Sequence, residues 1–248
     1  MHTGHLKIIV KSMIKYTDSH CHIITLSANT PMIFGRICNA KYESDWEKLT
    51  QIASDKNFVC LGLHPWFLDG RSNDWDKKLY AALMCDPKVA VGEIGLDKHH
   101  PDMQTQQDVF ITQLRIAYEL SRPVHIHCVG AWERITGIFK RFGKTMPRMV
   151  ITHSFNGDAE KISQMIEKYN MYFSYSGKQI ARGDRKTIER IQMTPLDRIL
   201  VESDTDTESN EISELDTALR GIGDIKSIPV ADLSEQIYQN FQRVTQND

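Results

Sequence analysis

Two histidines separated by one residue stand near the start of the chain, in the run Asp18-Ser19-His20-Cys21-His22. In a β-strand, residues two apart point to the same side, so His20 and His22 can present both imidazoles to one point. Neutral imidazole is the commonest nitrogen ligand of zinc and related ions, but two ligands alone make only a weak site. The pair predicts either half of a metal site or two half-buried, hydrogen-bonded histidines.

The same residue types recur at the ends of later apolar runs, each of which is a predicted strand. They are His64 after 58–63, Glu93 after 88–92, His127 at the end of 123–127, His153 at the end of 148–153 and Asp204 after 198–202. Five of the ten histidines in the chain occupy such positions, which is more than chance placement would give. This concentration favours the metal site over the pair of structural histidines.

Short apolar strands alternate with amphipathic helices along the chain. We expect strands at 14–20, 32–38, 58–63, 88–92, 123–127, 148–153, 171–175 and 198–202, and helices at 43–56, 75–84, 102–120, 132–142, 158–169 and 185–193. This alternation implies a parallel sheet, and eight strands predict an α/β fold of the (β/α)8 TIM barrel type. Active sites of such barrels lie at the C-terminal ends of the strands. Residues 23–31 are too few for a full helix, so we expect a reduced first βα connection.

The composition fits one folded domain. Of 248 residues, 41% are hydrophobic and 25% charged, which are ordinary globular values. We assign 13–248 to a single TIM-barrel hydrolase domain and 1–12 to an N-terminal tail. The formal net charge of −2 does not indicate a generally basic surface that coats nucleic acid, so any polyanion must be held by a local patch.

The cysteines and the apolar runs predict the compartment. Five cysteines without a C-x-x-C pair argue against a disulfide framework and for a reducing environment. The apolar run near the N-terminus is interrupted by lysine and is too short for a signal peptide or a membrane span. We therefore expect a cytoplasmic protein without membrane contact. No sequence feature indicates an oligomeric state.

Six short motifs together resemble the TatD-type metal-dependent DNases, which belong among the amidohydrolase-like TIM barrels. They are D-S-H-C-H at 18–22, G-L-H-P at 62–65, G-E-I-G-L-D at 92–97, P-V-H-I-H at 123–127, H-S-F-N-G at 153–157 and V-E-S-D at 201–204. They occur in the family's order and cover roughly residues 16–205. The resemblance implies a metal-dependent hydrolase, a TatD-like deoxyribonuclease, that cleaves phosphodiester bonds in DNA or in a small phosphodiester substrate.

The resemblance also implies a ligand set for divalent metal ions, which would be zinc, manganese or magnesium. The set comprises His20, His22, Glu93, His127, His153 and Asp204. Two ions about 3.5–4 Å apart need a bridging carboxylate, and Glu93 is placed for that role. The two histidines of the first strand would then join Asp204 at one ion, and the later two would hold the other.

Three residues of this region have expected catalytic or supporting roles. Asp204 is the candidate to orient or deprotonate the attacking water, and Glu202, two residues earlier, shares its face and would assist. His64 is expected to contact the substrate or a metal ligand. The hydroxide would attack phosphorus in line while the metals neutralise the growing charge.

Other residues near the predicted mouth have competing interpretations. Trp66 would either stack on a base or pack on the barrel rim. His125, one layer below His127, is expected to be a buried, hydrogen-bonded residue and not a ligand. Cys21 and Cys128 are expected to be small core residues. A basic group after the seventh strand, which includes Lys178 and Arg182, would contact phosphates.

The chain departs from the family's pattern at two places that bear on the substrate. Cys128-Val129-Gly130 stands where an arginine often follows the histidine of strand five, and Thr205-Asp206 follows Asp204 where Ala-Pro is usual. An amidohydrolase that acts on a small amide or ester would use nearly the same metals, and a non-catalytic protein could keep a structural metal. A groove with cationic and stacking groups would favour the nuclease, whereas a closed pocket would favour the amidase.

Overall fold

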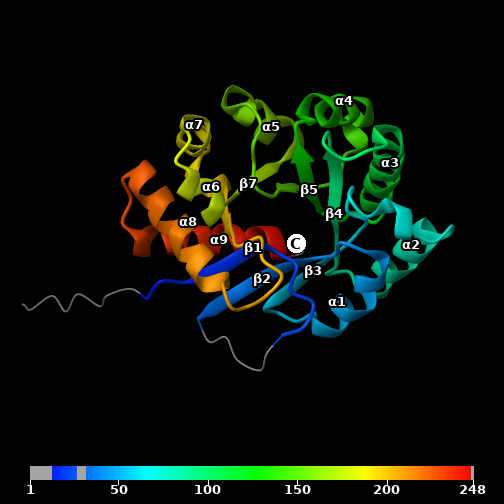
Figure 1. Cartoon of the computed structure of the whole chain (residues 1–248), viewed down its shortest axis with the longest axis horizontal. Helices are drawn as coiled ribbons and strands as arrows, with labels where there is room; N and C mark the ends of the chain where they lie inside the picture. The colour runs from blue at the N-terminus through cyan, green and yellow to red at the C-terminus, as the bar shows by residue number, and fades with distance from the viewer. Residues whose placement is uncertain (1–12, 27–31, 247–248) are drawn as a thin grey trace, which may run out of the picture.

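The computed structural model describes residues 13–26 and 32–246. Eight parallel strands follow one another around a sheet in chain order, with helices on its outside (Figure 1). The strands are β1 (Tyr16–Cys21), β2 (Ile33–Asn39), β3 (Asn57–Leu61), β4 (Ala90–Asp97), β5 (Val124–Val129), β6 (Val150–Thr152), β7 (Met171–Ser176) and β8 (Ile199–Glu202). The predicted α/β barrel is therefore confirmed. The predicted N-terminal tail, 1–12, lies outside the described residues.

Helices cover the outside of the sheet and one of its ends. They are α1 (Trp46–Ile52), α2 (Trp75–Cys85), α3 (Met103–Glu119), α4 (Trp132–Phe142), α5 (Ile162–Tyr169), α6 (Gly177–Arg182), α7 (Arg185–Met193), α8 (Glu211–Lys226) and α9 (Val230–Thr245). Apolar periodicity predicted α1 to α5 and α7, but not α6, α8 and α9. Between β1 and β2 the described residues contain no helix, in agreement with the expected reduced connection. No helix in the described ranges is both long and apolar enough to cross a membrane.

The barrel closes where the end of β1 meets the end of β8. The backbone N–H of Asp204 donates to the carbonyl of His20 over 3.0 Å. Just below, the buried carboxylate of Asp18 accepts hydrogen bonds from both the N–H and the hydroxyl of Ser203. These bonds hold two elements that are far apart in the sequence side by side at the mouth of the barrel.

The opposite end of the barrel is closed by α9, which crosses it in Figure 1. Phe241 and Val244 of this helix belong to an apolar cluster with side chains from the strands, namely Ile37, Phe58, Cys60, Ala90, Met149, Ile151, Tyr172 and Leu200. The ring of Phe241 lies so close to Gly35 that a Cβ atom at that position would be 2.4 Å from its Cε1 atom. The lower barrel is therefore filled by α9 and not by strand residues alone.

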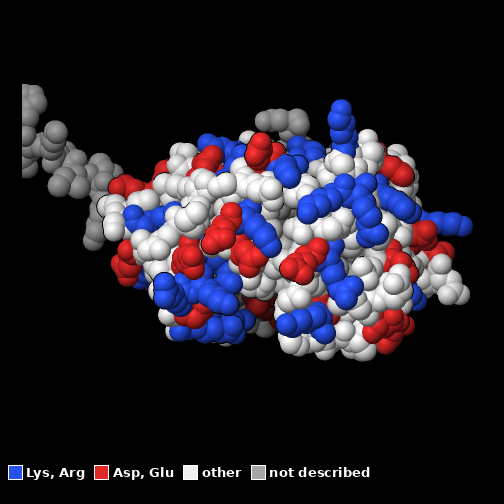
Figure 2. All heavy atoms as spheres, turned by 90° about the horizontal axis from the view of Figure 1, so that it is seen from above, with Lys and Arg blue, Asp and Glu red and all other residues white. Residues whose placement is uncertain are grey.

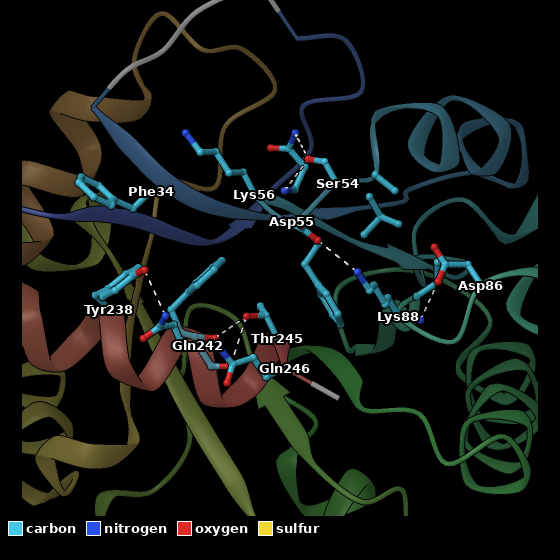
Figure 3. Close-up of a pocket in the computed structure, with 16 residues that line it drawn as sticks. Phe34, Ser54, Asp55, Lys56, Asp86, Lys88, Tyr238, Gln242, Thr245 and Gln246 are labelled. Atoms are coloured by element: carbon cyan, nitrogen blue, oxygen red, sulfur yellow. Dashed lines mark hydrogen bonds and ion pairs between the residues drawn. The ribbon is translucent and has the colours of Figure 1, made fainter. Parts of the chain in front are cut away.

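A cavity of about 570 Å³ opens beside α9 at this lower end (Figure 3). It lies between the C-terminal part of that helix and the starts of β2, β3 and β4. Aromatic side chains, such as Phe34 and Tyr238, and the exposed ion pair between Asp55 and Lys88 border it. Its described lining contains no histidine and no cysteine.

Candidate metal centre

The C-terminal ends of the strands converge on the carboxylate of Glu93, whose side chain is only 1% exposed. Its Oε2 atom lies 3.4 Å from Nε2 of His20 and 3.2 Å from Nε2 of His22. The same Nε2 atom of His20 is 3.9 Å from a carboxylate oxygen of Asp204. One oxygen of Glu93 thus faces the two histidines that end β1, with Asp204 nearby.

The other oxygen of Glu93 faces a second group of imidazoles. Oε1 is 2.8 Å from Nδ1 of His127 and 3.2 Å from Nε2 of His153. Nε2 of His64 is 3.3 Å from the same oxygen. The structure therefore brings together all seven residues that the sequence singled out, with a single carboxylate between two groups of donors.

A glycine in β4 allows these side chains to approach. Gly95 has a φ of +154°, and a Cβ atom at this position would lie 1.8 Å from the backbone oxygen of His127. Only glycine tolerates so close a contact between neighbouring strands. The G-E-I-G-L-D motif therefore carries both the central carboxylate, Glu93, and the glycine that lets β4 and β5 lie close together.

Polar groups lie beside the outer nitrogens of two of the imidazoles. Nδ1 of His22 donates a 3.0 Å hydrogen bond to the carbonyl of Asn39, and Nδ1 of His153 lies at an ion-pair distance of 3.4 Å from the buried carboxylate of Glu202 without a hydrogen bond. Such partners fix the tautomer of a ligating histidine and direct its free lone pair toward the metal. Glu202, expected to assist at the site, lies behind His153 and also accepts hydrogen bonds from Ser154.

Asp97 has the same role for His127, and sequence reasoning missed it. Its Oδ2 atom is 3.3 Å from Nε2 of His127 and accepts a 2.8 Å hydrogen bond from Nε1 of Trp66. These hydrogen bonds hold the pKa of Asp97 below its ordinary value although burial opposes this. Strand alternation could have identified it, because Glu93, Gly95 and Asp97 point to the same side of β4.

His64 presents a proton to the centre. The backbone N–H of Trp66 donates to its Nδ1 over 3.1 Å. Burial lowers the pKa of His64 to about 4, so the ring is neutral near pH 7 and carries its one proton on Nε2. A nitrogen that carries a proton is a hydrogen-bond donor and not a metal ligand. His64 therefore lies beside the centre, as the sequence predicted, in the position of a donor.

Buried charges of opposite sign determine the electrostatics of the centre. Burial opposes the charge of Glu93, but the surrounding imidazoles, His64 first among them, hold its pKa well below the usual range. Burial also lowers the pKa of His153, but the carboxylates of Glu93 and Glu202 outweigh it and raise this pKa to about 10. Positive charge is thus strongly favoured beside these carboxylates, whether a proton or a metal ion supplies it.

These residues fit divalent metal ions. Candidate donor atoms lie within 4.8 Å of one another in three overlapping groups, which are His20 with Glu93 and His153, His20 with His22 and Asp204, and Glu93 with His127 and His64. In the third group His64 is the hydrogen-bond donor, so Glu93 and His127 remain there as ligands. Oε2 of Glu93 is buried and has no hydrogen-bond partner among the described residues. An unpartnered buried carboxylate oxygen is costly, and a cation at this position would satisfy it.

Three neighbouring residues, His125, Cys21 and Cys128, were also expected to be buried. His125 is fully buried as predicted, and its ring packs edge to face against His20. Neither ring nitrogen has a hydrogen-bond partner among the described residues. Cys21 and Cys128 are buried, as predicted.

A second cavity, of about 530 Å³, opens above Glu93. Trp66 and Phe67, after β3, line one part of it, and Lys178 and Arg182, in α6 after β7, line another. Because β3 and β7 are four strands apart in an eight-stranded barrel, the aromatic and cationic groups face each other across the mouth. Figure 2 shows a face that carries both basic and acidic side chains and is not uniformly basic, in line with the formal net charge of −2.

Known proteins that resemble the chain share a family and a fold. A family model described as TatD related DNase matches residues 17–246. The metal-dependent hydrolase YabD of Bacillus subtilis is 28% identical over 200 residues, which cover 75% of this chain and 76% of that protein. The 3'-5' ssDNA/RNA exonuclease TatD of Pantoea ananatis is 29% identical over 171 residues, 67% of this chain and 64% of that protein. The crystal structure of YjjV, a TatD homologue from Escherichia coli, superposes with a TM-score of 0.78 at 22% identity over 93% of this chain and 98% of that one, which shows the shared fold.

Proposed function

Because the chain belongs to the TatD related DNase family, we propose that it is a metal-dependent nuclease that hydrolyses phosphodiester bonds at the Glu93 centre. The observation that carries this proposal is the buried carboxylate of Glu93, whose two oxygens face two separate groups of imidazoles. A carboxylate that bridges two metal ions needs this arrangement. The sequence-based expectation of a TatD-type hydrolase is confirmed by the family match.

The ligands divide between two ions. His20, His22 and Asp204 would hold one ion, His127 and His153 would hold the other, and Glu93 would bridge both. Imidazole-rich sites suit zinc and manganese better than magnesium, which prefers oxygen ligands. When bound, the ions supply an acidified water and neutralise charge on the non-bridging phosphate oxygens.

The protein's own residues position and move the protons. Asp204 lies at the mouth with its side chain 32% exposed, where it can orient the attacking water and accept its proton. His64 would donate a hydrogen bond from its Nε2–H group to an oxygen of the phosphate and keep the proton. The low exposure of the surrounding histidines, 0% for His20 and 5% for His127, keeps bulk water from competing for these contacts.

Single-stranded DNA or RNA is the substrate that we propose. The Pantoea ananatis relative is named for this activity, and the mouth offers the groups that such a substrate needs. Lys178 and Arg182, after β7, supply positive charge in a chain that has Val129 where the family often has an arginine, two residues after His127. An open mouth with these groups supports the nuclease over an amidase, which would enclose a small substrate.

The test is hydrolysis of fluorescent single-stranded DNA and RNA by purified protein whose metal content is measured on the same sample. We expect activity to disappear on treatment with a chelator and to return with manganese or zinc, with products that shorten from the 3' end. Protein that retains bound metal but cleaves neither nucleic acid, while it hydrolyses a small ester or amide, would overturn the proposal.

A further inference from the structure

Trp66 is a large aromatic side chain held in a fixed position at the mouth. Its side chain lines the cavity above Glu93 and remains 45% exposed. Single exposed apolar residues are common on protein surfaces and need no explanation by themselves. What distinguishes Trp66 is that several contacts hold its indole ring in place.

Two contacts orient the indole. Nε1 donates a hydrogen bond to Asp97 over 2.8 Å. The indole also stacks on the ring of His100, with ring centroids 4.6 Å apart and planes inclined by 16°. The rings of His64 and His127 approach it edge to face, with centroid distances of 5.1 and 5.6 Å. The indole is thus ordered before any ligand arrives, and a ligand that stacks on it loses little additional entropy.

The distances place this ring beside the reaction centre. His64 and His127 both lie within 3.3 Å of the central carboxylate, Glu93, and both contact Trp66. The indole is therefore separated from Glu93 by a single layer of imidazole side chains. The sugar that carries a phosphate bound at the centre brings its base within reach of the ring.

The opposite wall of the mouth has a different chemistry. Arg182 is exposed and has no ion-pair partner among the residues that the structure describes. Lys178 donates to the carbonyl of Asp204 over 3.0 Å and lies 3.9 Å from the carboxylate of the same residue. A strand that crosses the mouth would therefore meet a stacking surface on one side and cations on the other. Unpaired nucleic acid matches this pattern, because its bases and its phosphates can turn to opposite sides.

We propose that Trp66, backed by His100, is the base-binding residue of this enzyme and stacks on the base next to the scissile phosphate. This assignment rests on the proposed nuclease function. It makes Trp66 a specificity-determining residue, which favours a nucleotide with an unpaired base over an abasic one and recognises no particular sequence, since every base has a stacking face.

The test compares single-stranded DNA with the same oligonucleotide lacking the base at the scissile position. For the wild type, we expect kcat/KM to be about tenfold or more lower on the abasic substrate. Trp66→Ala should lower kcat/KM on the intact substrate by a similar factor but change it little on the abasic one. Metal content, measured in every sample, should stay the same.

Two further variants separate stacking from indirect effects. Trp66→Phe keeps an aromatic face but loses the hydrogen bond to Asp97, so it should retain most of the preference for the intact substrate. Tyr118→Ala removes an aromatic side chain that is 42% exposed on α3, away from the mouth, and should retain the full preference.

The outcomes distinguish this inference from the function on which it rests. Active wild-type enzyme that cleaves intact and abasic substrates equally would overturn the role of Trp66 and leave the nuclease in place. Equal losses for Trp66→Ala and Trp66→Phe on both substrates would also overturn it, because the residue would then act only through Asp97 and His127. Wild-type protein that cleaves no nucleic acid with any added metal would overturn the nuclease function itself.

Discussion

The two ends of the barrel contain cavities of similar size but opposite chemistry. The cavity above Glu93 measures about 530 Å³ and that beside α9 about 570 Å³. Five histidines surround the carboxylate at the upper end, whereas the described lining of the lower cavity has none and is formed by aromatic rings, amides and exposed charges. Volume therefore does not identify the site. Its location follows from the convergence of buried donor atoms.

The comparison also separates function from stability. The polar groups at the upper end lower the stability of the folded state, because burying carboxylates and imidazoles removes them from water. At the lower end, Phe241 and Val244 bury apolar surface inside the barrel. Substitutions at the two ends should therefore change different measurable quantities.

The largest effect is expected from Glu93→Gln. This substitution keeps the size of the side chain but removes the charge that two ions would share, so we expect kcat/KM to fall on the order of a thousandfold or more, together with bound metal. Circular dichroism should show a folded protein. Glu189→Gln, an exposed change on α7, is the matched control. Normal metal content with normal turnover would remove Glu93 from the mechanism.

Phe241→Ala should have its effect on stability. Removal of a ring that is 5% exposed should lower the free energy of unfolding by about 3–5 kcal/mol, while kcat/KM of the folded protein changes by less than about twofold. Urea unfolding measures the first quantity and substrate hydrolysis the second. Gln242→Ala on the same helix removes only a hydrogen bond to Tyr238 and should cost about 1 kcal/mol or less. A large loss of activity in folded Phe241→Ala would show that the two ends are coupled.

A smaller effect is expected from Asp97→Asn. The amide keeps the shape but loses the charge that orients His127, so metal affinity or activity should fall by roughly 10- to 100-fold. Competition with a chromogenic chelator measures the affinity. If the affinity remained that of the wild type, the ring of His127 would be oriented by Glu93 alone.

The smallest effect concerns alkaline pH and Tyr16 at the start of β1. Burial and the hydrogen bond to Asp216 raise the pKa of Tyr16 to about 12, above its ordinary value of 10.0. The folded state therefore binds more protons than the unfolded state between these two values, and stability is lost as pH rises through this window. Denaturation midpoints should decline less steeply between pH 10 and 12 in Tyr16→Phe. Identical slopes in the two proteins would contradict the assignment.

Much of the candidate site could be predicted because each proposed ligand follows an apolar strand. Parallel strands in a barrel bring their C-terminal ends together, so Glu93 and His153 meet although neither sequence segment shows the contact by itself. Asp97 was missed because it stands at the end of a strand already assigned a ligand, and its partners become visible only in three dimensions. The domain range 13–248 and the cytoplasmic location stay predictions.

At the lower end of the barrel, the sequence could predict a helix but not its position. Leu233, Ile237, Phe241 and Val244 recur at helical spacing, so α9 could have been predicted from its sequence. Its position across the barrel could not, because a buried stripe does not indicate which surface covers it. Trp66 is similar: the sequence left base stacking and rim packing open, and the contacts with Asp97 and His100 are tertiary.

The closure between β1 and β8 has a consequence for the order of events during synthesis. Asp18 and Ser203, which join the two strands below the centre, are 185 positions apart in the chain. Asp204 therefore reaches His20 and His22 only after nearly the whole barrel has been synthesised. An ion bound at His20, His22 and Asp204 would be acquired late in synthesis and would hold the first and last strands together. The supply of metal would then also influence the fraction of newly made chains that fold to the closed barrel.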